Sequence, residues 1–290
     1  MIQDMKILFG SVVLAATSVA SGQASVAILR NFANQEIDRM AMLLDEMGLD
    51  VTIFDQGQLT EDNAPTFDLV IWNDLSFANN GLQDPDVLAM NAAYMAGVPI
   101  YLIGDDLAIS YDNLDPAQDV IWESLLHLAQ GVNIVQNDEM VEIVRPAHPI
   151  TDGPFGVVGD FQCGIDPDGA VASRAGEIVL GIVDKWDAIL AYPESGDETR
   201  TVTQNVLLMS GHVIDQPVRD ALFKNSVSWL LGGLACPADC DANGSLNILD
   251  FVCFQQQWQR QTPVGDCDDN GAWNILDFVC YQGLFTQGCP

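Results

Sequence analysis

Residues 239–250 read DCDANGSLNILD, and residues 266–277 repeat the pattern as DCDDNGAWNILD. Each copy has oxygen-bearing side chains at positions 1, 3, 5, 9 and 12 of a twelve-residue segment, with glycine at position 6. A hard cation such as calcium takes about six to eight oxygen ligands, and the glycine permits the sharp turn of a loop around the ion. The two stretches therefore predict two calcium-binding loops.

The predicted ligands are the oxygen-bearing side chains of each loop and the backbone carbonyl at position 7. In the first loop they are Asp239, Asp241, Asn243, Ser245, Asn247 and Asp250, and in the second they are Asp266, Asp268, Asn270, Ala272, Asn274 and Asp277. A surface turn rich in Asp and Asn would explain one such stretch. It does not explain two copies in one register, because turns have no reason to repeat ligand spacing. We expect two calcium ions per chain.

Helix-breaking residues precede each loop, and helix signals follow it. Pro237 stands before the first loop, and Pro263 and Gly265 stand before the second, so no helix is expected to enter either loop. Apolar residues at helical spacing predict that a helix leaves each loop, over residues 249–256 and 276–283.

This duplicated loop and helix resembles the dockerin module, the calcium-dependent unit by which exported proteins attach to cohesin receptors. The resemblance covers residues 236–290 and includes Asp in place of Glu at position 12 of both loops. It implies a small all-α domain that mediates protein–protein interaction. Dockerins contact cohesins through small hydroxyl residues at positions 10 and 11, whereas this chain has Ile248-Leu249 and Ile275-Leu276 there. The partner is therefore open between a cohesin-like receptor and another extracellular protein.

Six of the seven cysteines lie in the C-terminal residues 235–290, which we call the tail: Cys236, Cys240, Cys253, Cys267, Cys280 and Cys289. Such density is common where a core is too small to hold a domain together without disulfides. Zinc is the competing interpretation, but the tail contains no histidine. The repeat symmetry suggests Cys240 with Cys253, Cys267 with Cys280, and Cys236 with Cys289, although other pairings stay open.

The first 24 residues have the features of a signal peptide. Lys6 precedes an apolar run over residues 7–16, and small residues at 20–24 supply a cleavage site. The run is too short for a membrane span. Together, the signal peptide and the cysteines predict a secreted protein that is extracellular or associated with the cell surface and does not span the membrane.

The charge of the chain excludes two classes of partner. Its formal net charge is −31, with only 10 lysines and arginines. No basic patch is available for nucleic acid or for an anionic membrane surface.

Residues 25–234 alternate strand and helix signals, which predicts an α/β domain with a doubly wound, flavodoxin-like sheet. Strands are expected at residues 25–29, 51–54, 68–73 and 99–104, and helices at residues 36–47, 86–96 and 115–129. Later strands are expected at residues 141–144, 170–173, 177–183, 188–192 and 205–209, before a closing helix at residues 217–231. The second half predicts antiparallel strands at one edge of the sheet.

This domain is similar to the class I glutamine-amidotransferase-like proteins, particularly their ThuA-like (trehalose-utilisation) branch. The likeness is carried by DLVIWND at 68–74, HPITDG at 148–153, and MSGH at 209–212 followed by FKNSVSWLLG at 223–232. Catalytic members of that superfamily place a Cys on a tight turn after a strand. The corresponding stretch here, LIGDDL at 102–107, has Asp105 in that place. The resemblance therefore implies a domain without the superfamily's Cys chemistry.

The candidate ligand-binding side chains of the large domain are Asp105, His148 and His212. They lie after strands or in loops, where α/β proteins place such groups. The alternatives are a capping or turn role for Asp105 and backbone hydrogen bonds for the two histidines. Cys163 is either a buried, inert thiol or a nucleophile paired with a histidine. His127, among leucines, is expected in the core.

These observations predict an exported calcium-binding protein whose tail anchors a non-catalytic α/β domain, in a polysaccharide-degradation or cell-envelope context that the dockerin resemblance implies. The alternative is a secreted hydrolase acting on glycans or sugar derivatives and targeted by the tail. A third interpretation is a calcium-dependent folding unit that has no receptor. Trp72 and Trp186 could line a site for a carbohydrate ligand, or they could simply pack in the core.

Overall fold

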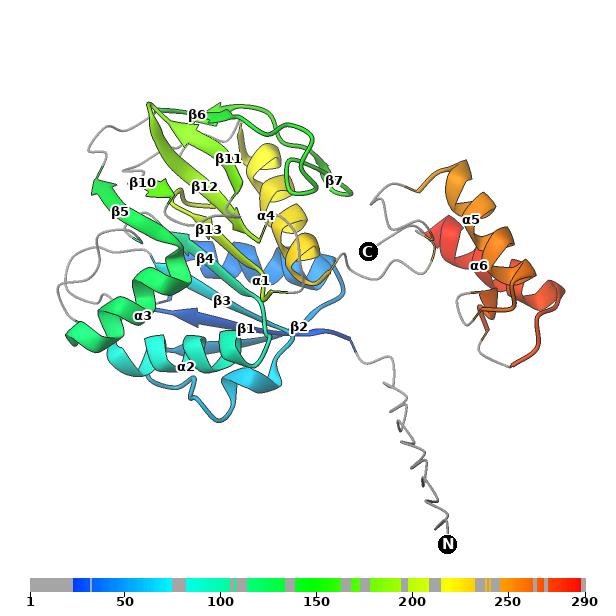
Figure 1. The fold of residues 1–290 in the computed structure, drawn as a ribbon, viewed down its shortest axis with the longest axis horizontal. Coiled ribbons are helices and arrows are strands. Elements are labelled where there is room, and N and C mark those ends of the chain that lie inside the picture. The colour runs from blue at the N-terminus through cyan, green and yellow to red at the C-terminus, as the bar shows by residue number, and fades with distance from the viewer. Residues whose placement is uncertain are drawn as a thin grey trace, which may run out of the picture.

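A computed structural model gives the structure of the chain (Figure 1). It describes residues 23–31, 33–74, 82–104, 107, 114–133, 139–162, 168–172, 178–193, 198–208, 215–232, 238, 240, 246–262, 265–268 and 271–287. Several predicted features lie outside these ranges, among them the signal peptide and the junction between the large domain and the tail.

Five parallel strands form one half of the main sheet. They are β1 (Ser25–Arg30), β2 (Asp50–Asp55), β3 (Leu69–Asp74), β4 (Ile100–Gly104) and β13 (Thr201–Gln204). Their spatial order is β2-β1-β3-β4-β13, so the direction of winding reverses between β1 and β3. This is the flavodoxin-like order, and the predicted doubly wound α/β class is confirmed.

Helices cover both faces of these strands (Figure 1). They are α1 (Gln35–Glu46), α2 (Asp84–Met95), α3 (Pro116–Leu126) and α4 (Gln216–Leu230). Alternate strand residues point to opposite faces. Val26 and Ile28 pack in one buried cluster with residues of α1 and α4, whereas Ala27 and Leu29 pack in a second cluster with residues of α2 and α3.

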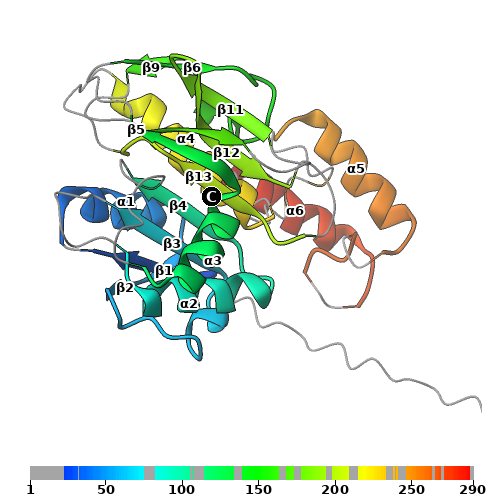
Figure 2. The same ribbon diagram turned by 60° about the vertical axis from the view of Figure 1, so that its left-hand side comes forward.

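Antiparallel strands continue the sheet beyond β13, as predicted (Figure 2). In spatial order they are β12 (Trp186–Tyr192), β11 (Ile178–Val183), β6 (Met140–Ile143) and β9 (Phe161–Gln162). Two more strands, β10 (Asp168–Ala172) and β5 (Leu128–Asn133), pair with each other, and β10 also pairs with β12. The remaining elements are the hairpin of β7 (Asp152–Gly153) and β8 (Gly156–Val157) and the 3-10 helix η1 (Ala64–Thr66).

Two sequence predictions were wrong at element boundaries. The helix expected to reach residue 129 ends at Leu126, because His127 adopts a left-handed backbone with φ of 57°. The strand expected at 205–209 is instead β13, four residues earlier. The apolar residues Val206 and Leu208 suggested a strand, but they fill the core from the loop that follows β13.

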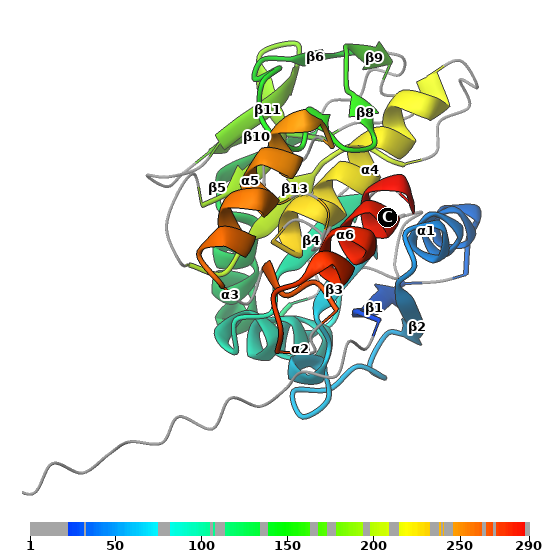
Figure 3. The ribbon, with the colours of Figure 1, turned by 90° about the vertical axis from the view of Figure 1, so that its right-hand side faces the viewer.

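The tail contains two helices, α5 (Ile248–Gln259) and α6 (Ile275–Gln287), at the places predicted to follow each loop. They lie side by side (Figure 3) and share an aromatic core. Phe254 stacks on Tyr281 with ring centroids 4.1 Å apart, and Phe254 and Trp258 each pack edge-on against Phe278. This contact gives a short segment a buried centre, since Phe254 and Tyr281 are each 1% exposed.

None of the helices in the described part of the chain is both long and apolar enough to cross a membrane.

Candidate functional site

Three carboxylates of the second predicted loop lie together in the structure. Asp266, Asp268 and Asp277 each offer an oxygen, and these oxygens all lie within 4.8 Å of one another. They occupy positions 1, 3 and 12, so residues at both ends of the loop meet. No other such group of three His, Cys, Asp or Glu side chains occurs among the described residues. Oxygen donors converging in this way suit a hard divalent cation.

Backbone hydrogen bonds hold two of these carboxylates in place. Asp277 is fully buried, and its carboxylate accepts N–H donors from Cys267 at 3.0 Å and from Asn274 at 2.6 Å. Asp266 accepts the N–H of Gly271 at 2.7 Å. Gly271 has φ of +77°, a left-handed conformation that favours glycine. The loop therefore closes on its own carboxylates.

The first loop shares the geometry of the second where both are described. Asp250 is fully buried and accepts the N–H of Asn247 at 2.8 Å, as Asp277 accepts that of Asn274. The Asn247 side chain in turn accepts the N–H of Leu249 and caps α5. The predicted ligands Asp239, Asp241, Asn243 and Ser245, and Asn270 of the second loop, lie outside the described residues.

Two predicted ligands of the second loop, Asn274 and Ala272, are hydrogen-bonded within the protein. The Asn274 side chain accepts the N–H of Leu276 at 2.9 Å and donates to the carbonyl of Ala272 at 2.7 Å. Asn274 thus caps α6, and its bond to Ala272 links positions 9 and 7 of the loop. Their role as ligands stays a prediction.

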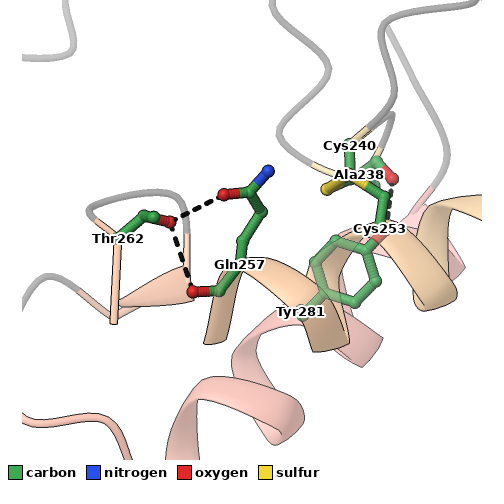
Figure 4. The surroundings of a disulfide bond; sticks show 6 residues. All are labelled: Ala238, Cys240, Cys253, Gln257, Thr262 and Tyr281. Carbon is green, nitrogen blue, oxygen red and sulfur yellow. Dashed lines mark hydrogen bonds between the residues drawn. A yellow bond between two sulfur atoms is a disulfide. The ribbon is translucent and has the colours of Figure 1, made fainter. Parts of the chain in front are cut away.

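The disulfides join Cys240 to Cys253, which Figure 4 shows, and Cys267 to Cys280, as the repeat symmetry suggested. Tyr281, drawn beside the first disulfide, donates its hydroxyl to the carbonyl of Ala238 at 2.6 Å and so ties α6 to the start of the first loop. Gln257 and Thr262 are hydrogen-bonded where α5 ends. Cys236, Cys289 and Cys163 lie outside the described residues.

A Gly265→Ala substitution is expected to destabilise the tail by roughly 1 to 3 kcal/mol, a typical cost of overpacking. A methyl group there would lie 2.6 Å from the backbone Cα and N atoms of Trp258, where the chain returns from α5 to the second loop. Thermal unfolding followed by near-ultraviolet circular dichroism measures the effect. The matched control is Gly283→Ala in α6, where an added methyl meets nothing within 4 Å. The close approach is refuted if the two variants have equal stability.

The first residues of α5 and α6 expose an apolar surface. Ile248 and Ile275 are 72% and 71% exposed, and Leu249 and Leu276 are 56% and 55% exposed. Val252 and Val279, one turn further on, are exposed as well. We call these six residues the apolar patch. Its two halves occupy equivalent loop positions, including positions 10 and 11. They lie at opposite ends of the helix pair, because Phe251 of α5 packs against Phe285 of α6 and Trp258 packs against Phe278.

His148 fixes a turn in the structure. Its Nδ1 accepts the N–H of Ile150 at 3.2 Å, and its backbone carbonyl accepts the N–H groups of Thr151 and Asp152. Its ring packs against Trp229 at the C-terminal end of α4. Because α4 begins beside the carboxyl ends of the strands and runs back along the sheet, His148 lies away from that edge.

Acidification from pH 7 to 4 is expected to destabilise the wild-type protein more than a His148→Asn variant, by about 1 to 2 kcal/mol. Burial and the nearby positive charge of Arg145 lower the pKa of His148 from 6.5 to about 4. Between these values the unfolded chain binds a proton that the folded chain does not, so this stability is lost as the pH falls. Protonation would also remove the acceptor for Ile150. Denaturant titrations of both proteins at several pH values measure the difference, and parallel pH profiles would contradict it.

The other side chains singled out in the large domain lie partly in the core and partly outside the described residues. His127 is buried and stacks on Tyr192 with ring centroids 4.1 Å apart, so it packs in the core as expected. Trp72 is fully buried between the sheet and its helices, where a carbohydrate cannot reach it. Trp186 is partly exposed and lies beneath the Lys185 ammonium group. Asp105 and His212 lie outside the described residues.

A polar group at the carboxyl ends of β1 and β3 was missed by sequence reasoning. Asn31 donates to Asp74 at 2.9 Å, and Asn34, the N-cap of α1, donates to Asn73 at 3.3 Å. Both bonds cross the point where the winding reverses, which is where open α/β sheets bind ligands. The Asn73 side-chain nitrogen is buried and has no hydrogen-bond acceptor among the residues that the structure describes. The available signal was the polar pair that ends the apolar strand at 73–74.

Comparison with known proteins identifies the fold but not the family. No protein-family model and no curated protein matches the chain. A cytoplasmic protein from Salmonella typhimurium has a similar structure, with a TM-score of 0.51, 13% identity, and coverage of 70% of this chain and 98% of that one.

Two other solved structures are weaker matches. A protein from Thermoplasma acidophilum, described as a subunit of a GMP synthase, gives a TM-score of 0.46 at 10% identity, covering 72% of this chain and 96% of its own. PurLQS from Thermotoga maritima gives 0.41 at 14% identity, covering 72% of this chain and all of its own. Similarity at this level carries no functional argument, and the Salmonella match alone shows a fold shared with this chain.

Proposed function

We propose that this chain is an exported calcium-binding protein whose dockerin-like tail anchors a non-catalytic, amidotransferase-like α/β domain to a cohesin-like or other extracellular protein. The setting is polysaccharide degradation or the cell envelope. The observation that carries the proposal is the convergence of Asp266, Asp268 and Asp277 at the loop positions that calcium requires.

Electrostatics favours a cation at this place. Two ionised carboxylates with oxygens 4.8 Å apart repel one another by about 3.5 kcal/mol at the effective dielectric constant near a protein surface. Their oxygens, with the Ala272 carbonyl and the Asn270 amide that the sequence places at positions 7 and 5, would form the donor set that calcium prefers. A bound ion would join the start of the loop to the first turn of α6, and would thereby fix the orientation of the helix. The equivalent residues of the first loop would hold the second ion.

The apolar patch supports an anchoring role. Single exposed apolar residues are common on protein surfaces, but here three of them cluster at the start of each helix, at opposite ends of the antiparallel pair, which supports a contact surface at each end. Calcium would act on this surface indirectly, because the ligands Asp250 and Asp277 lie in the same helical turns as the patch. The two disulfides agree with an oxidising, extracellular location.

The large domain is proposed to serve as the cargo of this anchor, without catalytic activity of its own. The support is the sequence at residues 102–107, where Asp105 stands in place of the superfamily's nucleophilic cysteine. The next residue in sequence, Asp106, is also an aspartate, so the neighbouring position lacks a thiol as well.

Binding of the full-length protein to a panel of purified cohesin modules tests the anchoring function. We expect binding in calcium, its loss in a chelator, and its loss in a Leu249→Lys/Leu276→Lys double variant. The matched control is Val120→Lys on α3, which changes a 65% exposed apolar residue of the large domain. If no module binds, the receptor belongs to another class or is absent. If the double variant binds as the wild type does, the apolar patch is not the contact surface.

A secreted hydrolase acting on glycans or sugar derivatives is the second candidate, favoured by the polar group at the ends of β1 and β3. Asp74 is held by the side-chain amide of Asn31 and is fully buried, so its use as an acid or base would require this edge of the sheet to open to a substrate. Turnover of a glycoside, ester or amide that is abolished in Asp74→Asn would establish this function. The control is Asp68→Asn, which changes a carboxylate before the opposite end of β3 that accepts hydrogen bonds from Ser25.

A further inference from the structure

Each disulfide of the tail joins the start of a predicted calcium loop to the helix that follows it. Cys267 stands at position 2, between Asp266 and Asp268, and Cys280 lies three residues after Asp277 on α6. The Cα atoms of the two cysteines are 5.9 Å apart. The disulfide therefore crosses the space that the loop has to close.

The same residues also position the carboxylates. The N–H of Cys267 donates to Asp277 at 3.0 Å, so the cysteine that forms the disulfide also holds the ligand at position 12. With Cys267 fixed against α6, its two neighbours Asp266 and Asp268 are brought to Asp277. Without that link, repulsion among the three carboxylates would favour an open loop.

The first loop has the same arrangement. Cys240 stands at position 2 and is bonded to Cys253, three residues after Asp250, with Cα atoms 5.7 Å apart. Both bonds span 13 residues of sequence. Stabilising the tail as a whole would not require the same cross-link twice, each time between position 2 of a loop and the helix that follows it. The repetition indicates that the disulfide belongs to the loop.

We infer that each disulfide sets the calcium affinity of its own loop, so that the tail is a redox-sensitive calcium switch. This inference rests on the proposed calcium binding. In the oxidised tail the ligands are preorganised, and binding does not have to close the loop. In the reduced tail, calcium binding has to close the loop as well. Closing a loop of about 15 residues is worth roughly 100-fold in an equilibrium constant, so reduction weakens binding by about 10- to 100-fold.

The redox step is a thiol–disulfide exchange with a dithiol reductant. One thiolate of the reductant attacks a cysteine sulfur, breaks the S–S bond, releases the partner cysteine as a thiolate and forms a mixed disulfide. The second thiolate then attacks the reductant's own sulfur in that mixed disulfide and releases the remaining cysteine as a thiolate. The two cysteines become thiols by gaining two electrons and two protons, and the dithiol is oxidised to a disulfide. Because the coupling is reciprocal, calcium protects each disulfide from reduction by the factor with which the disulfide favours calcium.

The test compares the full-length protein with Cys267→Ser/Cys280→Ser and Cys240→Ser/Cys253→Ser double variants. Calorimetric calcium titration is expected to show one site weakened by about 10- to 100-fold in each variant. The other site should be unchanged, so each variant is the control for the other. Fluorescence of Trp273, which lies in the second loop, assigns the affected site. Because the chain has six tryptophans, this signal is taken as the difference from a Trp273→Phe variant.

The outcomes separate this inference from the proposed function. If the oxidised wild type binds no calcium, the proposed function fails. If the wild type binds two ions and both double variants bind with wild-type affinity, only the redox coupling is refuted. Circular dichroism at saturating calcium checks that the variants fold. If a variant does not fold, the wild-type protein is equilibrated in a dithiol buffer with and without calcium, and the fraction of reduced disulfide is measured. Calcium should lower this fraction. An equal fraction in both conditions overturns the inference.

Discussion

An Asp277→Ala variant is expected to bind one calcium ion instead of two, with the affinity of the second loop reduced by at least about 100-fold. The buried carboxylate of Asp277 supplies the position-12 ligand, for which calcium loops use a carboxylate that contributes both oxygens. Its oxygens also accept the N–H groups of Cys267 and Asn274. Alanine would leave these two donors unsatisfied, at a cost of roughly 1 to 3 kcal/mol even without calcium.

The matched control for this prediction is Asp250→Ala, which changes the equivalent buried carboxylate of the first loop. Calorimetry should show the loss of one ion in each variant and of both ions in the double variant. Trp273 fluorescence should stop responding to calcium only where Asp277 is changed. Retention of two ions at wild-type affinity in Asp277→Ala would exclude the second loop as a calcium site.

Replacing Arg219 by methionine is expected to destabilise the large domain by roughly 3 kcal/mol, which lowers its melting temperature by about 6 to 12 °C. Arg219 lies on α4 and is 1% exposed. Its guanidinium group donates to the carbonyls of Leu207, after β13, and Gln162, at the end of β9, and lies over the ring of Phe161. Methionine would keep much of the packing but leave two carbonyls without a donor.

Differential scanning calorimetry measures the effect of Arg219→Met on the large domain. The control is Arg260→Met, since Arg260 is exposed at the end of α5 in the tail and its substitution should change the stability of the large domain by no more than about 0.5 kcal/mol. Equal melting temperatures for the two variants would show that the buried guanidinium is not needed to hold α4 against the antiparallel half of the sheet.

The sequence predicted those features that depend on local pattern. The strands at residues 25–29 and 68–73 were found because apolar β-branched residues fill both faces of a parallel sheet. The disulfides of Cys240 and Cys267 followed from the repeat, since equivalent cysteines in equivalent loops face equivalent partners.

Features that depend on which elements become neighbours were not predicted. The pairing of Asn31 with Asp74 exists only because β1 and β3 are adjacent, although the two residues lie 43 positions apart in sequence. The stacking of Phe254 on Tyr281 likewise depends on how α5 meets α6. The predicted position of β13 was four residues too late, because its two threonines carry weaker hydrophobic signals than the leucines that follow. In the structure Thr203 is buried and donates to the carbonyl of Leu126.

The central claim is tested most directly by calcium titration of the oxidised, full-length wild-type protein, by calorimetry with circular dichroism recorded in parallel. Two ions bound per chain, with a gain of order in the tail, is the result we expect. Absence of binding at millimolar calcium would contradict the account, because the carboxylates of Asp266, Asp268 and Asp277 would then meet without a cation to hold.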